Sequence, residues 1–326
     1  MNQKYRFCIG FVQLFERNLL GGFMLMKDYF LIKNDEYKIS KKSFYFDIET
    51  TGLNSKYDSI ILICAAFYYS DNEILIRQYF AEDIKDEKSI ILYFLEDIAS
   101  MKRCINFNGN TFDLPFLKKR ISNLSINELI LDNMESIDIL SYLRPLKKLW
   151  NFENLKLKTV EKFFSIERQD TISGKESVDM YKLYQKTKND SLKEKILLHN
   201  YEDVKHLILL ENKINNESKK RSRKISSNYG DFYLHLYDYK INKNKIEFIF
   251  SSEEPIPSMN IFSDNGDSVI SYGKTLRMTL LVMTGQNENN QEVVYLNLFG
   301  KNIPIFIDKS LFEDGIFYAL NSLFNA

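Results

Sequence analysis

The sequence has few cysteines, few prolines and no excess of charge, and each shortage excludes a class of protein. Its 326 residues include only 3 Cys, at Cys8, Cys64 and Cys104, too widely spaced for a disulfide framework or a cysteine-held metal ion. With 12 Gly, 5 Pro and 44% hydrophobic residues, it fits neither a fibrous nor a disordered chain. The 44 basic and 44 acidic residues cancel, so no global field attracts a polyanion. Any site for nucleic acid must therefore be local.

Long apolar runs are also absent from the sequence. The longest, around residues 60–67, is far shorter than the roughly 18 residues that cross a bilayer, so we expect no membrane partner. An odd number of thiols fits a reducing compartment, and we expect a cytoplasmic protein. Residues 1–23 fit neither a signal peptide nor a membrane anchor, and our hypothesis is that translation starts downstream of them, at Met24 or Met26.

From Lys42 the sequence alternates between strand and helix patterns. Alternating and β-branched segments predict strands at 43–49, 59–69, 73–81 and 104–107, the first three as an antiparallel meander. Apolar residues at helical spacing predict helices at 85–100, 111–121 and 191–212. We therefore expect an α/β domain over residues 41–214, preceded by an extension at residues 1–40.

The composition changes after residue 214. Residues 215–228 are polar and lack an apolar period, which predicts a solvated basic linker rather than a phosphate-binding patch; its cations are Lys219, Lys220, Arg221, Arg223 and Lys224. Residues 229–326 predict a small β-rich module, with a hairpin over 233–251, a strand pair at 276–284 and 292–298, and a closing helix at 310–324. Residues 225–326 hold 12 acids and 7 bases, so we expect this module to contact the first domain or a protein partner rather than nucleic acid.

Two acids at the end of the first predicted strand carry the strongest chemical signal. Asp47 and Glu49 are two residues apart, so both side chains project from one face of the sheet. Their charges repel unless a cation neutralises them, and carboxylate oxygens suit Mg²⁺ or Mn²⁺. Acids on an exposed strand end would be the simpler interpretation, but the apolar residues at 44–46 predict a buried strand. The turn that follows offers backbone N–H groups to a phosphate; it comprises Thr50, Thr51 and Gly52.

A third acid and a histidine with a fourth acid follow further along the chain. Asp113 lies in the first turn of the helix predicted at 111–121, where the helix dipole alone would explain an acid. His199 and Asp203 are four residues apart and share one face of the last predicted helix, while Glu202 points elsewhere. No one of these residues would identify a site by itself.

Taken in order, Asp47-x-Glu49, Asp113 and His199-x-x-x-Asp203 resemble the motifs of the DEDD exonucleases of the ribonuclease H-like superfamily. Between the second and third motifs the sequence looks like the YprB family of predicted ribonuclease H-like exonucleases, at residues 136–140, Arg144, 157–161, 166–170, Gly174 and Tyr181. The resemblance covers about residues 43–213. It implies a ribonuclease H-like mixed β-sheet flanked by helices.

The resemblance also implies roles for the residues of these motifs. The four acids Asp47, Glu49, Asp113 and Asp203 would bind two divalent ions, with Asp47 bridging them and Asp113 acting through water. His199 would be the general base, although it stands four residues before the last Asp, where the tyrosine-type exonucleases have Tyr. Leu53 would wedge against the terminal base, and the substrate strand would contact Thr50, Thr51, Gly52 and Asn108.

These residues predict a metal-dependent nuclease acting on DNA or RNA, and the family implies a 3′–5′ exonuclease. The same acids would serve an endonuclease or junction resolvase, because they do not require a strand end. A non-catalytic nucleic-acid-binding scaffold on the same fold is the alternative of a different class. We expect Asp138 and Glu161 to form structural pairs, with Arg144 or Arg168, and we assign no role to His206 or His235.

Overall fold

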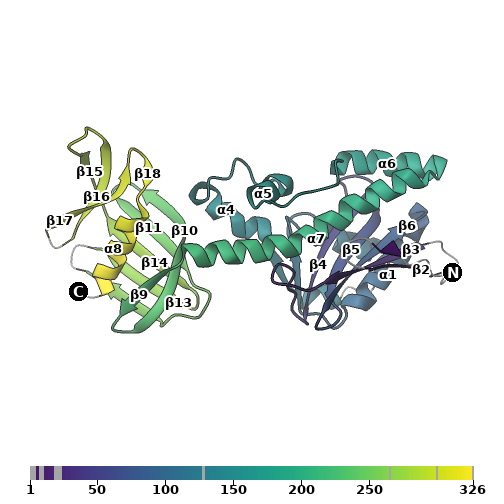
Figure 1. Cartoon of the computed structure of the whole chain (residues 1–326), viewed down its shortest axis with the longest axis horizontal. Helices are drawn as coiled ribbons and strands as arrows, with labels where there is room; N and C mark the ends of the chain where they lie inside the picture. Colours follow the sequence, from purple (N-terminus) through teal and green to yellow (C-terminus); the bar gives the residue numbers. More distant parts are fainter. Residues whose placement is uncertain are drawn as a thin grey trace. The chain divides into compact units, whose positions relative to one another are not determined.

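The computed structural model describes residues 5–6, 11–17, 24–126, 129–263, 266–298 and 300–324. The chain packs as two compact units, one formed by Met1–Arg144 with Phe152–Ile214 and the other by Pro145–Asn151 with Asn215–Ala326. Figure 1 shows both units and labels most of their elements. In the described parts of the chain, no helix combines the length and apolarity needed to cross a membrane.

The first unit is built on a mixed eight-stranded sheet with the order β1-β2-β3-β6-β5-β4-β7-β8. The pairs β4–β7 and β7–β8 are parallel, and the others are antiparallel. The strands are β1 (Tyr5–Arg6), β2 (Phe11–Arg17), β3 (Met24–Ile32), β4 (Ser43–Thr50), β5 (Ile60–Tyr68), β6 (Glu73–Ala81), β7 (Arg103–Asn106) and β8 (Glu135–Asp138). The strands predicted at 43–49, 59–69, 73–81 and 104–107 correspond to β4, β5, β6 and β7.

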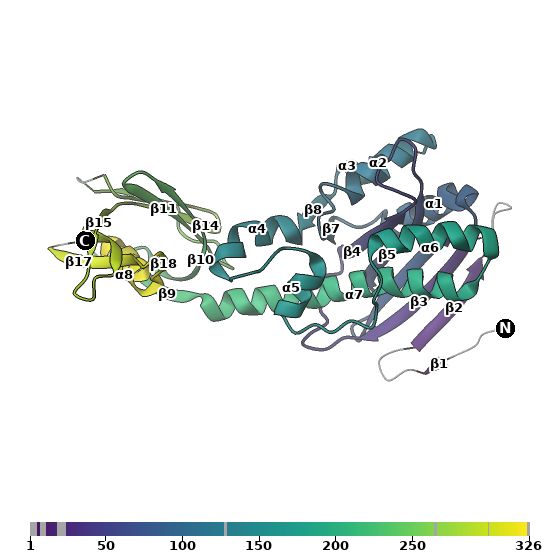
Figure 2. The same cartoon turned by 90° about the horizontal axis from the view of Figure 1, so that it is seen from above.

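Helices cover both faces of this sheet, as Figure 2 shows. The helices up to residue 221 are α1 (Glu87–Ile98), α2 (Asp113–Asn123), α3 (Leu129–Asp132), α4 (Ile139–Leu149), α5 (Leu157–Phe163), α6 (Gly174–Thr187) and α7 (Asp190–Arg221), with a 3₁₀ turn, η1, at Ile84–Asp86. One core joins α1 and α2 to Phe46 and Ile48 of β4. A second core joins α6 and α7 to Leu62 of β5 and Phe80 of β6. Coverage on both sides explains why β5 is a nearly continuous apolar run.

The prediction that residues 1–40 form an extension outside the domain is wrong for β3. This strand pairs with β6 along its whole length, from Met24 to Ile32, and Met24, Met26 and Leu31 are buried. The alternation of apolar side chains in 24–32 is weak because Lys27 and Asp28 interrupt it. Asp28 is buried only because Arg77 of β6 pairs with it, a partner 49 residues away.

The basic linker predicted at 215–228 is also wrong. Residues 215–221 continue α7, and β9 (Arg223–Ser227) follows almost at once. Extending a helix that has already formed adds a hydrogen bond per residue without a new nucleation cost, so a polar sequence can remain helical. An ion pair between Glu217 and Arg221, one turn apart, supports this end of the helix.

The second unit contains two antiparallel sheets, with the orders β12-β13-β14-β11-β10-β9 and β15-β16-β17-β18. A common core joins both sheets to α8 (Glu313–Phe324). The remaining strands are β10 (Gly230–Asn242), β11 (Lys245–Ser251), β12 (Met259–Phe262), β13 (Ser268–Tyr272), β14 (Thr275–Leu281), β15 (Met283–Gln286), β16 (Glu292–Leu298), β17 (Lys301–Ile307) and β18 (Ser310–Leu311). The predicted fold class, a mixed sheet flanked by helices and followed by a small β-rich module, is confirmed.

One predicted strand pair in this module is partly wrong. The segment 276–284 does not pair as a unit with 292–298, because β14 lies between β11 and β13 in the larger sheet. Of this segment, Met283 and Thr284, at the start of β15, pair with β16. The buried side chains of β14 alternate through Leu276, Met278 and Leu280, and the chain leaves this sheet at Val282. The expected hairpin over 233–251 is present as β10 and β11.

Candidate active site

The alternation of β4 places its two acids on the face of the sheet that α7 covers. Phe46 and Ile48 point into the core with α1, so Asp47 and Glu49 project to the opposite side. There the side-chain amide of Asn200 on α7 donates a 2.7 Å hydrogen bond to Oδ2 of Asp47. The strand and the helix therefore meet directly at the first acidic motif.

Asp113 joins these acids from α2. Its Oδ1 accepts a 3.2 Å hydrogen bond from the backbone N–H of Ile48, the residue between Asp47 and Glu49. Burial raises the pKa of Asp113 to about 7, although the Ile48 N–H opposes this shift. The acid at the start of α2 thus does more than stabilise the dipole of its own helix, since it belongs to the cluster on β4.

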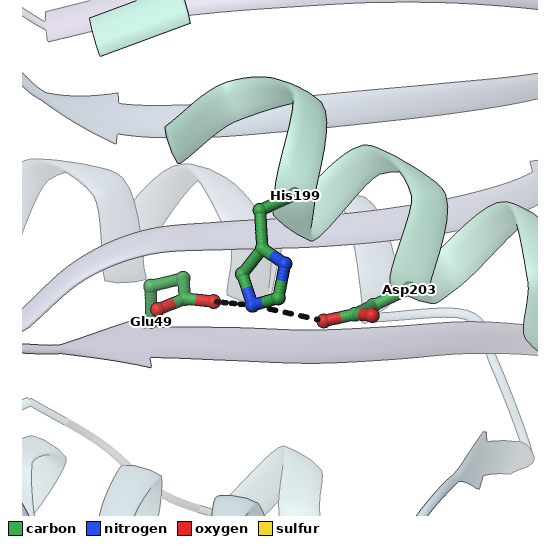
Figure 3. Close-up of side chains that lie close together, drawn as sticks. All are labelled: Glu49, His199 and Asp203. Carbon is green, nitrogen blue, oxygen red and sulfur yellow. Dashed lines mark ion pairs between the residues drawn. The ribbon is translucent and has the colours of Figure 1, made fainter. Parts of the chain in front are cut away.

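His199 and Asp203 complete the cluster from α7. Figure 3 shows the imidazole between two carboxylates, with Nε2 3.6 Å from Oε1 of Glu49 and 3.7 Å from Oδ2 of Asp203. One ligand atom from each of these three buried residues lies within 4.8 Å of the others. The helical spacing predicts that His199 and Asp203 share one face of the helix, and the structure places both side chains close to each other and His199 close to Glu49 of β4.

The electrostatics of the cluster favour a bound cation. Burial, followed by repulsion from Asp113, Asp203 and Glu49, raises the pKa of Asp47 well above its usual range. Burial also raises the pKa of Glu49 to about 7, a shift that His199 opposes. Carboxylates held this close resist ionisation, and a divalent ion would remove the repulsion.

A second layer of charged residues lies behind His199 and Asp203. Asp170 places Oδ2 2.7 Å from Nδ1 of His199. The guanidinium of Arg168 donates to Asp203, to Asp170 and to Glu161, and its side chain is only 8% exposed. Both residues come from the segment between α5 and α6, which the fold brings next to His199 and Asp203.

Glu202 holds this segment against α7. Its carboxylate accepts hydrogen bonds from the backbone N–H groups of Gln169 and Asp170, the latter at 2.7 Å. Glu202 does point away from the four acids, as the helical spacing predicts. It anchors the loop that carries Arg168 and Asp170. Sequence reasoning missed the roles of these residues, and the only signal was that 166–170 belongs to the stretch that resembles the YprB family.

A family model described as the RNase_H superfamily matches residues 44–215, more than half of the chain. The chain belongs to the RNase_H superfamily. All four acids, His199 and the second layer fall inside the matched range. The resemblance to the narrower YprB family stays a prediction.

Solved structures similar to this RNase_H superfamily chain include polymerase and exonuclease structures. The family B DNA polymerase of the hyperthermophilic archaeon Pyrobaculum calidifontis is 15% identical, with a TM-score of 0.44 over 54% of this chain and 25% of the polymerase. E. coli Exonuclease I in complex with a dT13 oligonucleotide is 12% identical, with a TM-score of 0.33 over 64% of this chain and 55% of that chain. Its zinc-bound complex with ssDNA is 13% identical, with a TM-score of 0.31 over 65% of this chain and 55% of that chain. The chain therefore spans between a quarter and about half of these proteins, and no curated protein sequence matches it significantly.

The turn after β4 of the RNase_H superfamily domain is held closed by Asp58. The Asp58 carboxylate accepts hydrogen bonds from the hydroxyl of Thr51 and the backbone N–H of Asn54. A Cβ on Gly52 would lie 2.5 Å from this carboxylate, so a side chain at this position would have to displace Asp58. Leu53 projects outward and is 86% exposed. The contacts predicted between this turn and a substrate stay predictions.

The secondary candidates have mainly structural contacts. Asp138 accepts hydrogen bonds from the backbone N–H of Asn108 and from the first turn of α4, rather than pairing with an arginine as predicted. The backbone of Asn108 has a positive φ of 67°, which suits an Asn in a turn. Glu161 pairs with Arg168, one of its two predicted partners, and its Oε1 lies 3.2 Å from Nδ1 of His206.

The donor set fits a divalent metal ion. Glu49, Asp113 and Asp203 are buried, Asp47 is partly buried, and all four contribute hard oxygen ligands. These residues would therefore hold one or two ions.

Proposed function

We propose that this chain is a metal-dependent nuclease that hydrolyses phosphodiester bonds of DNA or RNA, most specifically a 3′–5′ exonuclease. The observation that carries this proposal is the meeting of Asp47, Glu49, Asp113 and Asp203 at one site, from β4, α2 and α7. Membership of the RNase_H superfamily supports the same conclusion. The 3′–5′ direction comes from the DEDD resemblance.

Two divalent ions, Mg²⁺ or Mn²⁺, would be held by the four carboxylates. When bound, such ions supply Lewis-acid chemistry at the attacking water and at the leaving oxygen of a phosphodiester. The chain itself supplies the fixed oxygens that place the ions. Asn200 and the backbone of Ile48 orient Asp47 and Asp113 before any ion arrives, which reduces the reorganisation needed on binding.

His199 would accept the proton of the attacking water. Its Nε2 faces the space between Glu49 and Asp203, where metal-ligand oxygens lie on both sides. General base catalysis needs an acceptor within reach of the water and with a pKa near the working pH, and imidazole meets the second requirement. The proton moves from the water oxygen to Nε2. The resulting hydroxide forms a bond to phosphorus while the bond from phosphorus to the 3′ oxygen of the remaining strand breaks, and that oxygen takes up a proton.

Leu53 would contact the terminal base of the strand. It is exposed at the tip of the turn that follows the two acids of β4, as a side chain that wedges against a base must be. Thr50, Thr51, Gly52 and Asn108 would contact the backbone of the same strand. We also propose that residues 229–326, with their surplus of acids, contact a protein partner, and that the protein is cytoplasmic.

The test uses the purified full chain with Mn²⁺ or Mg²⁺ against single- and double-stranded DNA and RNA labelled at the 3′ or the 5′ end. We expect the 3′ label to be released in the first step and the 5′-labelled strand to shorten stepwise, with no activity in EDTA and none in Asp47→Ala or Asp203→Asn. Cleavage of closed single-stranded circles would instead indicate the endonuclease or resolvase alternative. Binding of a strand without metal-dependent cleavage would indicate the scaffold alternative, and full activity in both variants would refute the site.

A further inference from the structure

We infer that Asp170 is a positioning residue that fixes the hydrogen of His199 on Nδ1 and leaves Nε2 free to accept a proton at the cluster of acids. The hydrogen-bond arrangement can be tested by itself, whereas its catalytic consequence rests on the proposed nuclease function. The two carboxylates that Nε2 faces come from β4 and α7, and Asp170 lies on the opposite side of the ring.

The contacts of Asp170 show that it can only accept a hydrogen from His199. Its Oδ1 accepts from the backbone N–H of Ile172 at 2.9 Å. Its Oδ2 accepts from Nζ of Lys158 at 3.0 Å and from Arg168 at 3.2 Å. Two cations keep this carboxylate ionised, and an ionised carboxylate has no hydrogen to donate. The Nδ1 atom, 2.7 Å from Oδ2, must therefore be the donor.

The distances on the other side of the ring agree with this assignment. A neutral imidazole with its hydrogen on Nδ1 carries a lone pair on Nε2. The separations of 3.6 Å from Glu49 and 3.7 Å from Asp203 are too long for hydrogen bonds from Nε2. The ring thus has one hydrogen-bonded side, facing Asp170, and one side that faces the acids without donating to them.

The position of Asp170 is set by the helix that carries His199. Glu202, three residues after His199 on α7, accepts the backbone N–H of Asp170. Arg168 contacts both Asp170 and Asp203. These contacts connect the loop to Glu202 and Asp203 of α7, and the side chain of Asp170 is only 2% exposed. With its oxygens occupied and out of reach of solvent, Asp170 acts through His199 and does not bind metal or substrate.

Nuclear magnetic resonance of the metal-free full chain tests this arrangement directly. The chain has 3 His, so ¹⁵N-histidine labelling gives three imidazoles, and loss of one in His199→Ala identifies His199. At a pH where the ring is neutral, we expect the hydrogen on Nδ1. In Asp170→Asn the oxygen that stays with Lys158 and Arg168 is the one that faces Nδ1, but a neutral amide is a weaker acceptor than a carboxylate, so we expect a smaller share of the hydrogen on Nδ1. A hydrogen on Nε2 in the unsubstituted protein overturns the inference, whether or not the variant folds. If the variant folds and its tautomer is the same as in the unsubstituted protein, the inference is also overturned.

Asp28→Asn is the matched control. Asp28 is also buried and also pairs with an arginine, Arg77, but it lies on β3 and contacts none of the four acids in the described structure. We expect this variant to keep the tautomer of His199 and the nuclease activity. A tautomer that moved in the control as well would show that general loosening of the fold, and not Asp170, decides it.

Nuclease kinetics test the consequence. General base catalysis contributes about 10²–10⁴-fold, and Asp170→Asn weakens the orientation of the base without removing it, so we expect kcat to fall by about 10-fold or more with KM and Mn²⁺ affinity unchanged. The double variant with His199→Ala should be no slower than His199→Ala alone. A further loss in the double variant overturns the inference, since Asp170 would then act independently of His199. If the unsubstituted protein shows no nuclease activity, the proposed function fails, while the tautomer measurement still decides the role of Asp170.

Discussion

Asn200 of α7 donates a 2.7 Å hydrogen bond to Oδ2 of Asp47 across 153 positions of the sequence. The amide has no exposed surface, and it lies next in sequence to His199. Two neighbouring residues of α7 therefore contact the two acids of β4. Asn200 orients Asp47, and His199 places its imidazole beside Glu49. This arrangement links the first and last motifs of the site.

Loss of this hydrogen bond should weaken metal binding. We expect Asn200→Ala to lower Mn²⁺ affinity and nuclease activity by about 10–100-fold, the usual effect of removing a residue that orients a metal ligand. The measurement is calorimetric titration with Mn²⁺ alongside the nuclease assay. Asn212→Ala is the matched control, because Asn212 is also on α7 but donates to the backbone of Glu36 and Ile208. Equal losses in both variants would contradict a specific role for Asn200.

Metal binding should depend strongly on pH. Burial raises the pKa of Glu49 from 4.5 and that of Asp113 from 3.8, both to about 7, in the metal-free fold. The folded protein therefore binds more protons than the unfolded chain across this window, so metal-free stability should fall as pH rises from about 5 to 7. Divalent ions must displace these protons, and we expect Mn²⁺ to bind more tightly at pH 8 than at pH 6 with release of protons.

Calorimetry in two buffers of different ionisation enthalpy measures this release. Thermal unfolding with and without Mn²⁺ measures the stability, and the metal should stabilise the protein more at pH 8 than at pH 6. Metal affinity that did not change over this range would contradict the assignment of Glu49 and Asp113 as ligands.

The turn after β4 should not tolerate a side chain at Gly52. A Cβ there would approach the carboxylate of Asp58 to 2.5 Å, and Asp58 is held by Thr51 and Asn54. We expect Gly52→Ala to destabilise the protein by about 1–3 kcal/mol, as overpacking does, and to lower nuclease activity. Gly174→Ala is the control, because nothing lies within 4 Å of a Cβ at Gly174, on the first turn of α6. Equal losses of thermal stability in the two variants would contradict the close contact between residue 52 and Asp58.

His235 should make the second unit sensitive to acid. It is 3% exposed, and neither ring nitrogen has a hydrogen-bond partner in the described structure. Burial lowers the pKa of His235 from 6.5 to about 4. The unfolded chain then binds the extra proton between pH 6.5 and 4, so stability is lost as pH falls through this range, by up to about 1.4 kcal/mol per pH unit.

Urea unfolding at pH 7, 6 and 5 tests this with the fluorescence of Trp150. It is the single Trp of the chain, is 2% exposed and belongs to the second unit. We expect His235→Phe to reduce the loss of stability between pH 7 and pH 5. Equal pH dependence in both proteins would mean that His235 does not titrate as its burial requires.

The elements that the sequence predicted well are those with a strong local pattern. The apolar run of β5 and the helical spacing of α1 gave their positions within one or two residues. Prediction failed where a partner far along the chain decided the outcome. Residues 24–32 form a strand because β6 pairs with them, and 276–284 divides between two sheets because the core of the second unit selects the side chains of β14.

In the candidate site, too, local spacing predicts some residues and misses others. Spacing alone places Asp47 and Glu49 on one face of a strand, and His199 and Asp203 on one face of a helix. It cannot place Asp170, because a loop has no repeating geometry that fixes the direction of a side chain. Arg168 is similarly unmarked, since an arginine beside acids is common on any polar surface.

By itself, the sequence determined which residues are candidates for the chemistry, because carboxylates at strand and helix spacings have few other uses in a buried setting. Only the tertiary structure decided how these residues act together. The hydrogen bonds from Asn200 to Asp47, from Ile48 to Asp113 and from His199 to Asp170 join residues 29 to 153 positions apart. Such contacts depend on the packing of α2 and α7 against opposite faces of one sheet, and no local pattern encodes that packing.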